Sequence, residues 1–420
     1  MELSKDIYLY LTRFADDKTI LNMLSVNKKY NNEKFFEQVM RRKYPLLIKF
    51  KKEYETWKKF FMGMFYCIAK IEETHGVSYY PVEGYNPKLY CNKSKQNILN
   101  DIMLYAAKNG QKDIVEIMIQ KGSTVFNKAM VWTAASGHKD MVEYMIQKGA
   151  DKFNVAIIYA AYYGHKHIVE LLIQNGATNF DEAMAIAARG GQKDIVELMI
   201  QKGATSFDWA MTAASRAGHK DIVELMIQKG ATNFNNAVRP AARKGYKDIV
   251  ELLIQNGATN FNESMKLAAK YGHKDIVELM IQKGATELDV AMASAAKRGH
   301  KDIVELLIQN GVTDLDVAMA SAAKRGHKDI VELLIQNGAT NFDKAMTWAA
   351  YGGYKDIVEL MIQKGATNFD EAMEVAAQAG QKDIVEMMIQ KGATDIHQAM
   401  RWASIGGHED IVNYLKSLMK

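Results

Sequence analysis

Apolar residues recur at helical spacing through most of the chain, and a representative segment is Phe180–Gly203, FDEAMAIAARGGQKDIVELMIQKG. The apolar face of its first half is made by Phe180, Ala183, Met184, Ala187 and Ala188. The apolar face of its second half is made by Ile195, Val196, Leu198, Met199 and Ile200. This spacing predicts two helices, over Asp181–Arg189 and Lys193–Gln201, that form a helical hairpin.

The hairpin recurs with a strict period, because a glycine returns every 27 residues, twelve times, from Gly110 to Gly407. A lone hairpin cannot bury its apolar face, so a fixed period of this length predicts copies stacked on one another. In the last copy Lys416 stands where the representative copy has Ile200, as expected for a polar terminal cap. Such a stack favours an extended binding surface over a catalytic pocket.

The repeated segment resembles the ankyrin repeat, whose pattern includes an Ala-Ala pair, Gly-His, a Val-Val-Glu-Leu-Leu-type helix and Gly-Ala-Asp. The match reads AASRAGHKDIVELMIQKGAT across Ala213–Thr232. Each copy is about six residues shorter than the usual ankyrin period, and Phe-Asp-Glu-Ala-Met replaces the Thr-Pro-Leu-His start. The missing part corresponds to the β-hairpin finger, so finger-mediated binding is not implied. Shortened arrays of this kind resemble the ankyrin proteins of amoeba-infecting giant viruses.

The resemblance implies an all-α fold, an ankyrin-like solenoid of helical hairpins with a small N-terminal helical domain. We expect a helical head at residues 1–45, a helix plus an irregular connector at 46–98, and twelve repeats with a C-terminal cap at 99–420. Within the array, Pro240 is expected to interrupt the first helix of its copy, because proline lacks a backbone N–H.

The head resembles an F-box, with a leucine near the start, Asp-Ile, a Leu-rich helix with Ser-Val-Asn-Lys-Lys-Tyr, and then an aromatic helix. It departs from that pattern at Ser4, where an F-box usually has proline. The resemblance implies docking onto a Skp-family adaptor of a cullin–RING ubiquitin ligase. The contacts implied are Leu3, Ile7, Leu11, Ile20, Leu24 and Val26. The alternative is that this apolar stripe forms the core of an N-terminal cap.

The copies differ most on the first helix, at the positions equivalent to Ala185, Ile186, Arg189 and Gly190. In ankyrin arrays this helix lines the concave face, so the resemblance implies that these positions bind a target protein or peptide. The candidate residues are Trp132, Tyr159, Tyr162, Tyr163, Arg189, Arg216, Arg243, Lys270, Lys297, Lys324, Trp348, Tyr351 and Trp402. Aromatic ends and a basic centre suit an acidic or extended protein segment. Alternatively, the cations are solvated helix ends that are favourable to the helix dipole.

Charge separates the head from the array and argues against general nucleic-acid binding. Residues 1–98 hold 18 Lys+Arg and 11 Asp+Glu, whereas residues 99–420 hold 36 and 38. Nucleic-acid binding rests on phosphate neutralisation, so a near-neutral array disfavours it.

The two cysteines, Cys67 and Cys91, indicate a reducing compartment. The longest apolar stretch, Phe60–Ala69, is about half of a membrane span. We therefore expect an intracellular monomer, in the host cytoplasm, with no membrane segment.

No catalytic, metal or cofactor site is predicted. Seven of the ten histidines occupy the same turn position in different copies, where Gln and Tyr also occur, so a turn role is expected rather than metal binding or proton transfer. Phosphate-binding Gly-Lys-Ser loops and Cys-x-x-Cys pairs do not occur. The leading hypothesis is a non-enzymatic adaptor whose array captures a target and whose head presents it for ubiquitylation. The alternatives are a scaffold or sequestering module with no ubiquitin link, and a nucleic-acid binder.

Overall fold

The helical hairpin of the sequence pattern is repeated along the computed structural model, which describes residues 95–419. This part of the chain contains 24 helices and no strand, so the all-α prediction is confirmed. The first helices of the repeats are α5 (Lys95–Lys108), α7 (Phe126–Ser136), α9 (Phe153–Tyr162), α11 (Phe180–Gly190), α13 (Phe207–Ala217), α15 (Phe234–Lys244), α17 (Phe261–Tyr271), α19 (Leu288–Ala296), α21 (Leu315–Ala323), α23 (Phe342–Gly352), α25 (Phe369–Ala379) and α27 (Ile396–Gly406).

The second helices are shorter and more uniform, because their sequence scarcely changes between copies. They are α6 (Lys112–Gln120), α8 (Lys139–Gln147), α10 (Lys166–Gln174), α12 (Lys193–Gln201), α14 (Lys220–Gln228), α16 (Lys247–Gln255), α18 (Lys274–Gln282), α20 (Lys301–Gln309), α22 (Lys328–Gln336), α24 (Lys355–Gln363), α26 (Lys382–Lys391) and α28 (Glu409–Ser417). In the representative copy the first helix extends one residue beyond the predicted range at each end, and the second coincides with it.

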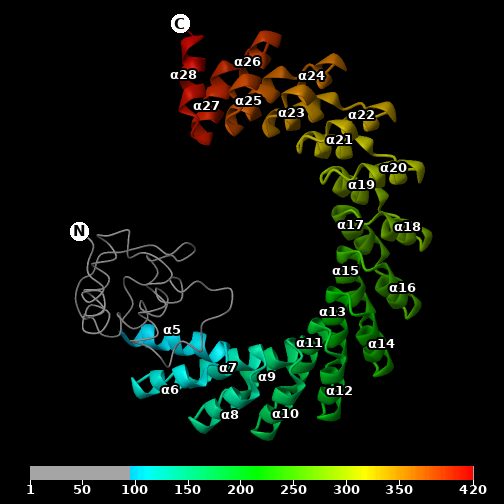
Figure 1. The fold of residues 1–420 in the computed structure, drawn as a ribbon. Helices are drawn as coiled ribbons and strands as arrows, with labels where there is room; N and C mark the ends of the chain where they lie inside the picture. Colours follow the sequence, from blue (N-terminus) through cyan, green and yellow to red (C-terminus); the bar gives the residue numbers. More distant parts are fainter. Residues whose placement is uncertain (1–94, 420) are drawn as a thin grey trace, which may run out of the picture. The chain divides into compact units, whose positions relative to one another are not determined.

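The chain forms two compact units, Met1–Ala183 and Met184–Lys420, which we call the N-terminal and C-terminal units. Each first helix that lies wholly within one unit packs against its own second helix and against the first helices of adjoining repeats in that unit. Neighbouring second helices contact each other much less. Along the C-terminal unit the first helices lie on the inner side of the stack and the second helices on the outer side (Figure 1). We therefore call them inner and outer helices.

The core is built from small alanines and flexible methionines at the predicted apolar positions. In the representative copy Met184, Ala187 and Ala188 are fully buried on the inner helix, as are Ile195 and Val196 on the outer helix. Alanine pairs let the backbones of inner helices approach closely, and methionine fills the remaining irregular space.

Two inner helices place a serine where the representative copy has a core alanine. Ser215 and Ser264 are fully buried. Their hydroxyl oxygens are the two buried side-chain polar atoms of the described residues that have no hydrogen-bond partner. Each therefore carries an uncompensated desolvation cost.

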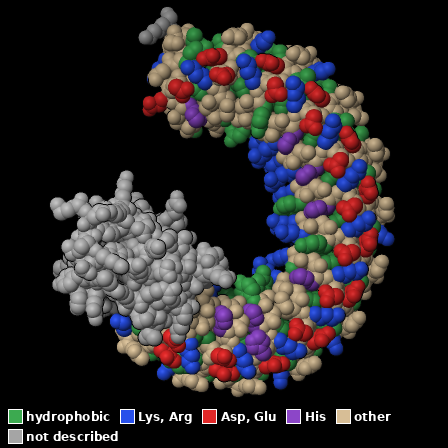
Figure 2. Space-filling view, in the orientation of Figure 1, with side chains coloured by type: hydrophobic (Ala, Val, Ile, Leu, Met, Phe, Trp, Pro, Cys, Tyr) green, Lys and Arg blue, Asp and Glu red, His purple; other side chains and the backbone are tan. Residues whose placement is uncertain are grey.

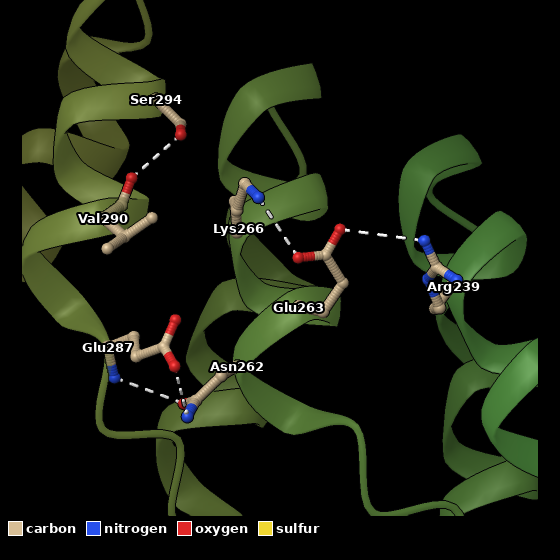
Figure 3. A network of polar contacts seen from close by, with 7 residues as sticks. All are labelled: Arg239, Asn262, Glu263, Lys266, Glu287, Val290 and Ser294. Carbon is tan, nitrogen blue, oxygen red and sulfur yellow. Dashed lines mark hydrogen bonds and ion pairs between the residues drawn. The ribbon is translucent and has the colours of Figure 1, made fainter.

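A side chain in the first turn of most inner helices joins consecutive repeats. On α17, Asn262 Oδ1 accepts a hydrogen bond from the backbone N–H of Thr286 at 2.7 Å. It accepts another from the backbone N–H of Glu287 at 3.2 Å (Figure 3). The same two bonds are made by Asn127, Asn154, Asp208, Asn235, Asp289, Asp316, Asp343 and Asp370. We call this series the Asx ladder. It ties down the turn before the next inner helix.

A second series of contacts joins the turns between inner and outer helices. Gly137 has a φ of +80°, and a Cβ there would lie 2.7 Å from the His165 ring of the next repeat. The position thus requires glycine for its left-handed backbone and for space. His165 Nε2 donates to the carbonyl oxygen of Ala135 at 3.2 Å. Equivalent bonds are made by His138, His273, His300 and His408, which confirms a structural turn role for these histidines.

Two local details complete the fold. Helix α15 continues through Pro240 from Phe234 to Lys244, so the expectation that this proline interrupts the helix is wrong. The proline costs one backbone hydrogen bond, but packing against α13, α16 and α17 retains the helix.

At the C-terminal end Lys416 is exposed, as predicted for a cap, while Leu415 remains buried.

Candidate functional site

Lysines and arginines gather on the inner helices of the C-terminal unit, from α13 to α21 (Figure 2). Arg216, Arg243, Lys270, Lys297 and Lys324 occupy one equivalent position near the end of each inner helix. Adjacent positions add Arg239, Lys244, Lys266, Arg298 and Arg325. We call these ten residues the basic strip. Arg189 holds the equivalent position on α11 and is exposed.

Few carboxylates accompany the basic strip. Glu263 on α17 lies between Arg239, at 3.9 Å, and Lys266, at 3.2 Å, and forms ion pairs with both (Figure 3). Within residues 95–419, the other eight cations of the strip have no carboxylate within ion-pair distance. Burial, together with the positive charges of Arg325 and Lys297, lowers the pKa of Lys324. The strip therefore presents concentrated positive charge despite the near-neutral array.

Aromatic rings from the same or the next repeat hold several of these cations in place. The Arg243 guanidinium lies 4.9 Å from the centre of the Tyr271 ring, and Lys270 Nζ lies 5.5 Å from it. Lys324 Nζ lies 3.7 Å from the centre of the Trp348 ring and 5.0 Å from that of Tyr351. Cation–π attraction restricts these otherwise flexible side chains. Trp348 is half-buried and covered by an ammonium group, whereas Tyr351 is exposed.

Beyond α23 a carboxylate, Glu374 on α25, takes the position that Arg239 and Lys266 hold in the basic strip. Trp402 on α27 is half-buried, and its indole Nε1–H donates to Glu374 Oε2 on α25 at 3.2 Å. Burial raises the pKa of Glu374, and the negative charges of Asp395 and Asp370 add to that rise. The bond from Trp402 opposes it. Trp402 is thus engaged by a carboxylate and is not an open aromatic anchor.

The four aromatic candidates of the N-terminal unit are exposed. Trp132 on α7 and Tyr159 on α9 expose 43% and 46% of their surface. Tyr162 and Tyr163 are also exposed, and their rings meet edge to face with centres 5.0 Å apart. Tyr105 on α5 occupies the same repeat position as Trp132 and Tyr159 and is exposed as well. The N-terminal unit therefore carries its own aromatic row on three successive inner helices.

Several surface residues escape the sequence reasoning. Arg239, Lys266 and Tyr271 lie at the variable positions recognised in the sequence, and extending the comparison to every copy would have found them. Trp209 lies one turn earlier, where the representative copy has Glu182, and it is exposed. Its only signal is an aromatic residue at a position that is otherwise mostly polar or aliphatic.

The proposed adaptor-docking residues lie outside the described residues. These are Leu3, Ile7, Leu11, Ile20, Leu24 and Val26. The boundary expected at residue 99 lies inside α5, which begins at Lys95. Among residues 95–419, no group of His, Cys, Asp and Glu side chains is arranged to hold a metal ion. No helix in that range is long and apolar enough to cross a bilayer.

Comparisons with known proteins identify the repeat. The protein-family model described as ankyrin repeats (3 copies) matches residues 134–208, 157–237, 237–318, 265–345, 292–372 and 319–400. These matches together extend over more than half of the chain. Among solved structures, the human ASB11 ankyrin repeat domain is similar, with 19% identity and a TM-score of 0.36 over 42% of this chain and 96% of that chain. A search of curated proteins finds no match.

Proposed function

Because the chain belongs to the ankyrin-repeat family, whose repeats form protein–protein interaction modules, we propose that its C-terminal unit captures an acidic segment of a target protein. The observation that carries this proposal is the basic strip, in which eight of ten cations have no carboxylate partner within the described part of the chain. Burial, and after it the positive charges of Arg325 and Lys297, lower the pKa of Lys324, and a partner that brings carboxylates offsets the repulsion from those charges.

The charge distribution favours a local acidic segment over a long polyanion. The array as a whole holds 36 Lys+Arg and 38 Asp+Glu, and acidic side chains follow the strip on α25. These carboxylates repel a nucleic acid that runs along the inner helices, whereas a short acidic segment ends before α25. Exposed charges of this kind accelerate association and make binding dependent on salt.

The competing explanation is that the cations only complement their own helix dipoles. Basic residues in the last turn of α13, α15 and α17 fit that role. It does not account for Arg239 and Lys266, which lie a turn earlier, nor for the pairing of cations with rings of the next repeat.

The test is binding of a fluorescent polyglutamate peptide to the full chain and to two charge-matched variants. The first, Arg243→Glu with Lys270→Glu, reverses the centre of the strip. The second, Lys229→Glu with Lys283→Glu, reverses two exposed cations that follow outer helices α14 and α18. We expect at least about tenfold weaker binding for the first variant. Equal losses in both variants contradict binding at the inner helices.

The head extends this proposal to ubiquitin ligase recruitment. We infer that residues 1–45 dock a Skp-family adaptor, so that the captured target is presented to a cullin–RING ligase. The support is the F-box-like pattern of the sequence. The test compares proteins recovered by the full chain and by a Leu11→Asp, Leu24→Asp variant. Recovery of Skp and cullin subunits only by the full chain supports the inference, and their absence leaves a scaffold or sequestering module.

We expect the chain to act as a monomer in the cytoplasm of a host cell, where Skp-family adaptors are available. Light scattering after gel filtration measures the mass of the purified chain against the 47.3 kDa of one copy. Immunofluorescence of the expressed chain tests the compartment. A dimer mass or a nuclear signal contradicts the corresponding part of this expectation.

A further inference from the structure

Five consecutive repeats present one cation each at the same structural position. Arg216, Arg243, Lys270, Lys297 and Lys324 are 27 residues apart and lie at the C-terminal ends of α13, α15, α17, α19 and α21. All five belong to the C-terminal unit. They therefore form a regular series of charges whose period equals the distance between successive inner helices. We call these five residues the cation series.

The packing of the inner helices fixes that period. Each of the five helices packs directly on the next. Helices in direct contact lie about 8–10 Å apart, depending on the side chains between them. These helices bury small alanines, such as Ala241 and Ala268. The cations therefore recur about every 9 Å.

This period matches three residues of an extended polypeptide. A polyproline II segment rises about 3.1 Å per residue with three residues per turn, so its every third side chain returns to the same face after about 9 Å. An α-helix offers a similar distance only between residues seven apart, and such positions drift about 20° around the helix at each step. An extended segment thus keeps five carboxylates facing five cations, whereas a helix does not.

Contacts around the cation series hold individual cations at defined positions, which favours a partner whose charges are in register with them. The Tyr271 ring lies near both Arg243 and Lys270, and the Trp348 ring holds Lys324 Nζ at 3.7 Å. Restrained cations lose less freedom when a carboxylate binds. The series stops after Lys324, because the next equivalent position is Tyr351. At the other end Arg189 on α11 holds the equivalent position, so the series defines the spacing of the charges read.

We propose that the cation series binds an extended partner segment that carries a carboxylate at every third residue, one for each repeat from α13 to α21. This inference rests on the proposed function, because it specifies the acidic segment that the strip captures. Its basis is charge complementarity together with the match between helix spacing and the rise of an extended chain.

The test compares peptides of identical composition and charge with the full chain by fluorescence anisotropy. One peptide repeats Glu-Pro-Ser five times, which places Glu at every third position and prevents helix formation. The other contains the same residues with the five Glu in one block. Each exposed ion pair contributes about threefold to affinity. If the block keeps about two pairs in register, the periodic peptide binds about 30-fold more tightly.

A single-site variant checks that the gain arises at the cation series. Lys270→Gln removes the central charge, and Lys283→Gln removes an exposed charge after outer helix α18 as the matched control. We expect Lys270→Gln to weaken the periodic peptide several-fold and to change the block peptide less. We expect Lys283→Gln to leave the preference for the periodic peptide unchanged.

The outcomes separate this inference from the proposed function. Equal binding of both peptides, weakened by charge reversal of the strip, retains acidic-segment binding and overturns the spacing rule. Failure of both peptides to bind overturns the spacing rule and the proposed function together. Tighter binding of a helical peptide with Glu at every seventh position overturns the extended conformation. Tighter binding of a thymidine oligonucleotide at matched charge overturns a protein ligand.

Discussion

Replacing Asp343 with alanine is expected to loosen one junction between repeats in the C-terminal unit. The Asp343 side chain accepts hydrogen bonds from the backbone N–H groups of Thr367, at 2.6 Å, and Asn368, at 2.8 Å. Each such bond contributes about 1 kcal/mol net, so the variant loses about 2 kcal/mol of local stability. That loss corresponds to about 30-fold faster opening of the turn before α25.

Hydrogen exchange followed by mass spectrometry measures this opening directly. Local exchange is preferable to a single unfolding midpoint, because repeat arrays need not unfold in one step. We expect faster exchange in a peptide that covers residues 364–370, with distant repeats unchanged. Asp343→Asn should restore slow exchange, because asparagine makes the same two bonds at Asn262.

The matched control is Glu359→Ala, which removes an exposed carboxylate from the neighbouring outer helix α24. It tests whether loss of negative charge alone accelerates exchange. Equal exchange rates in Asp343→Ala and Glu359→Ala would refute the reasoning, since the Asx ladder would then make no contribution to this junction.

Three further predictions concern the core, the turns and the acidic end of the C-terminal unit. Ser215→Ala and Ser264→Ala should each stabilise the chain by about 1 kcal/mol, measured by urea unfolding, because each removes a buried hydroxyl without a partner. Gly326→Ala should cost about 3 kcal/mol and Gly338→Ala about 1 kcal/mol, since both have a positive φ but only the first places a Cβ against a ring of the next repeat. Equal costs would show that the ring contact is unimportant. Burial raises the pKa of Glu374, so the folded state retains its proton longer and loses stability as the pH rises above the ordinary value of about 4.5. Glu374→Gln should therefore stabilise the chain more at pH 7 than at pH 4, and an effect independent of pH would contradict this reasoning.

The sequence predicts the repeat better than it predicts the contacts between repeats. Strict periodicity gives both helices of Phe180–Gly203 almost to the residue, because apolar spacing and turn glycines agree in every copy. The Asx ladder was not predicted, since it joins residues 24 and 25 positions apart through side-chain geometry. The sequence likewise does not show that the turn glycines leave room for a ring of the next repeat, because that contact also joins distant positions. At Pro240 the sequence predicts a break in the helix, but tertiary packing keeps α15 continuous.

For the candidate surface, the sequence predicts which side chains lie on the inner helices but not which neighbouring side chains contact them. The repeat register places Arg243, Lys270 and Lys324 on the inner helices. It does not reveal that the ring of Trp348 is covered by Lys324, nor that Trp402 donates to Glu374. These contacts depend on side chains from neighbouring repeats, so comparison of equivalent positions cannot find them.

The central claim is that acidic segments bind the inner helices of the C-terminal unit. The measurement that tests it most directly is lysine acylation by an amine-reactive reagent, quantified by mass spectrometry with and without polyglutamate. We predict that polyglutamate protects Lys270 and Lys297 on the inner side and leaves Lys229 and Lys283, which follow outer helices, fully reactive. Protection of the outer lysines with unchanged labelling of the inner lysines would contradict the claim.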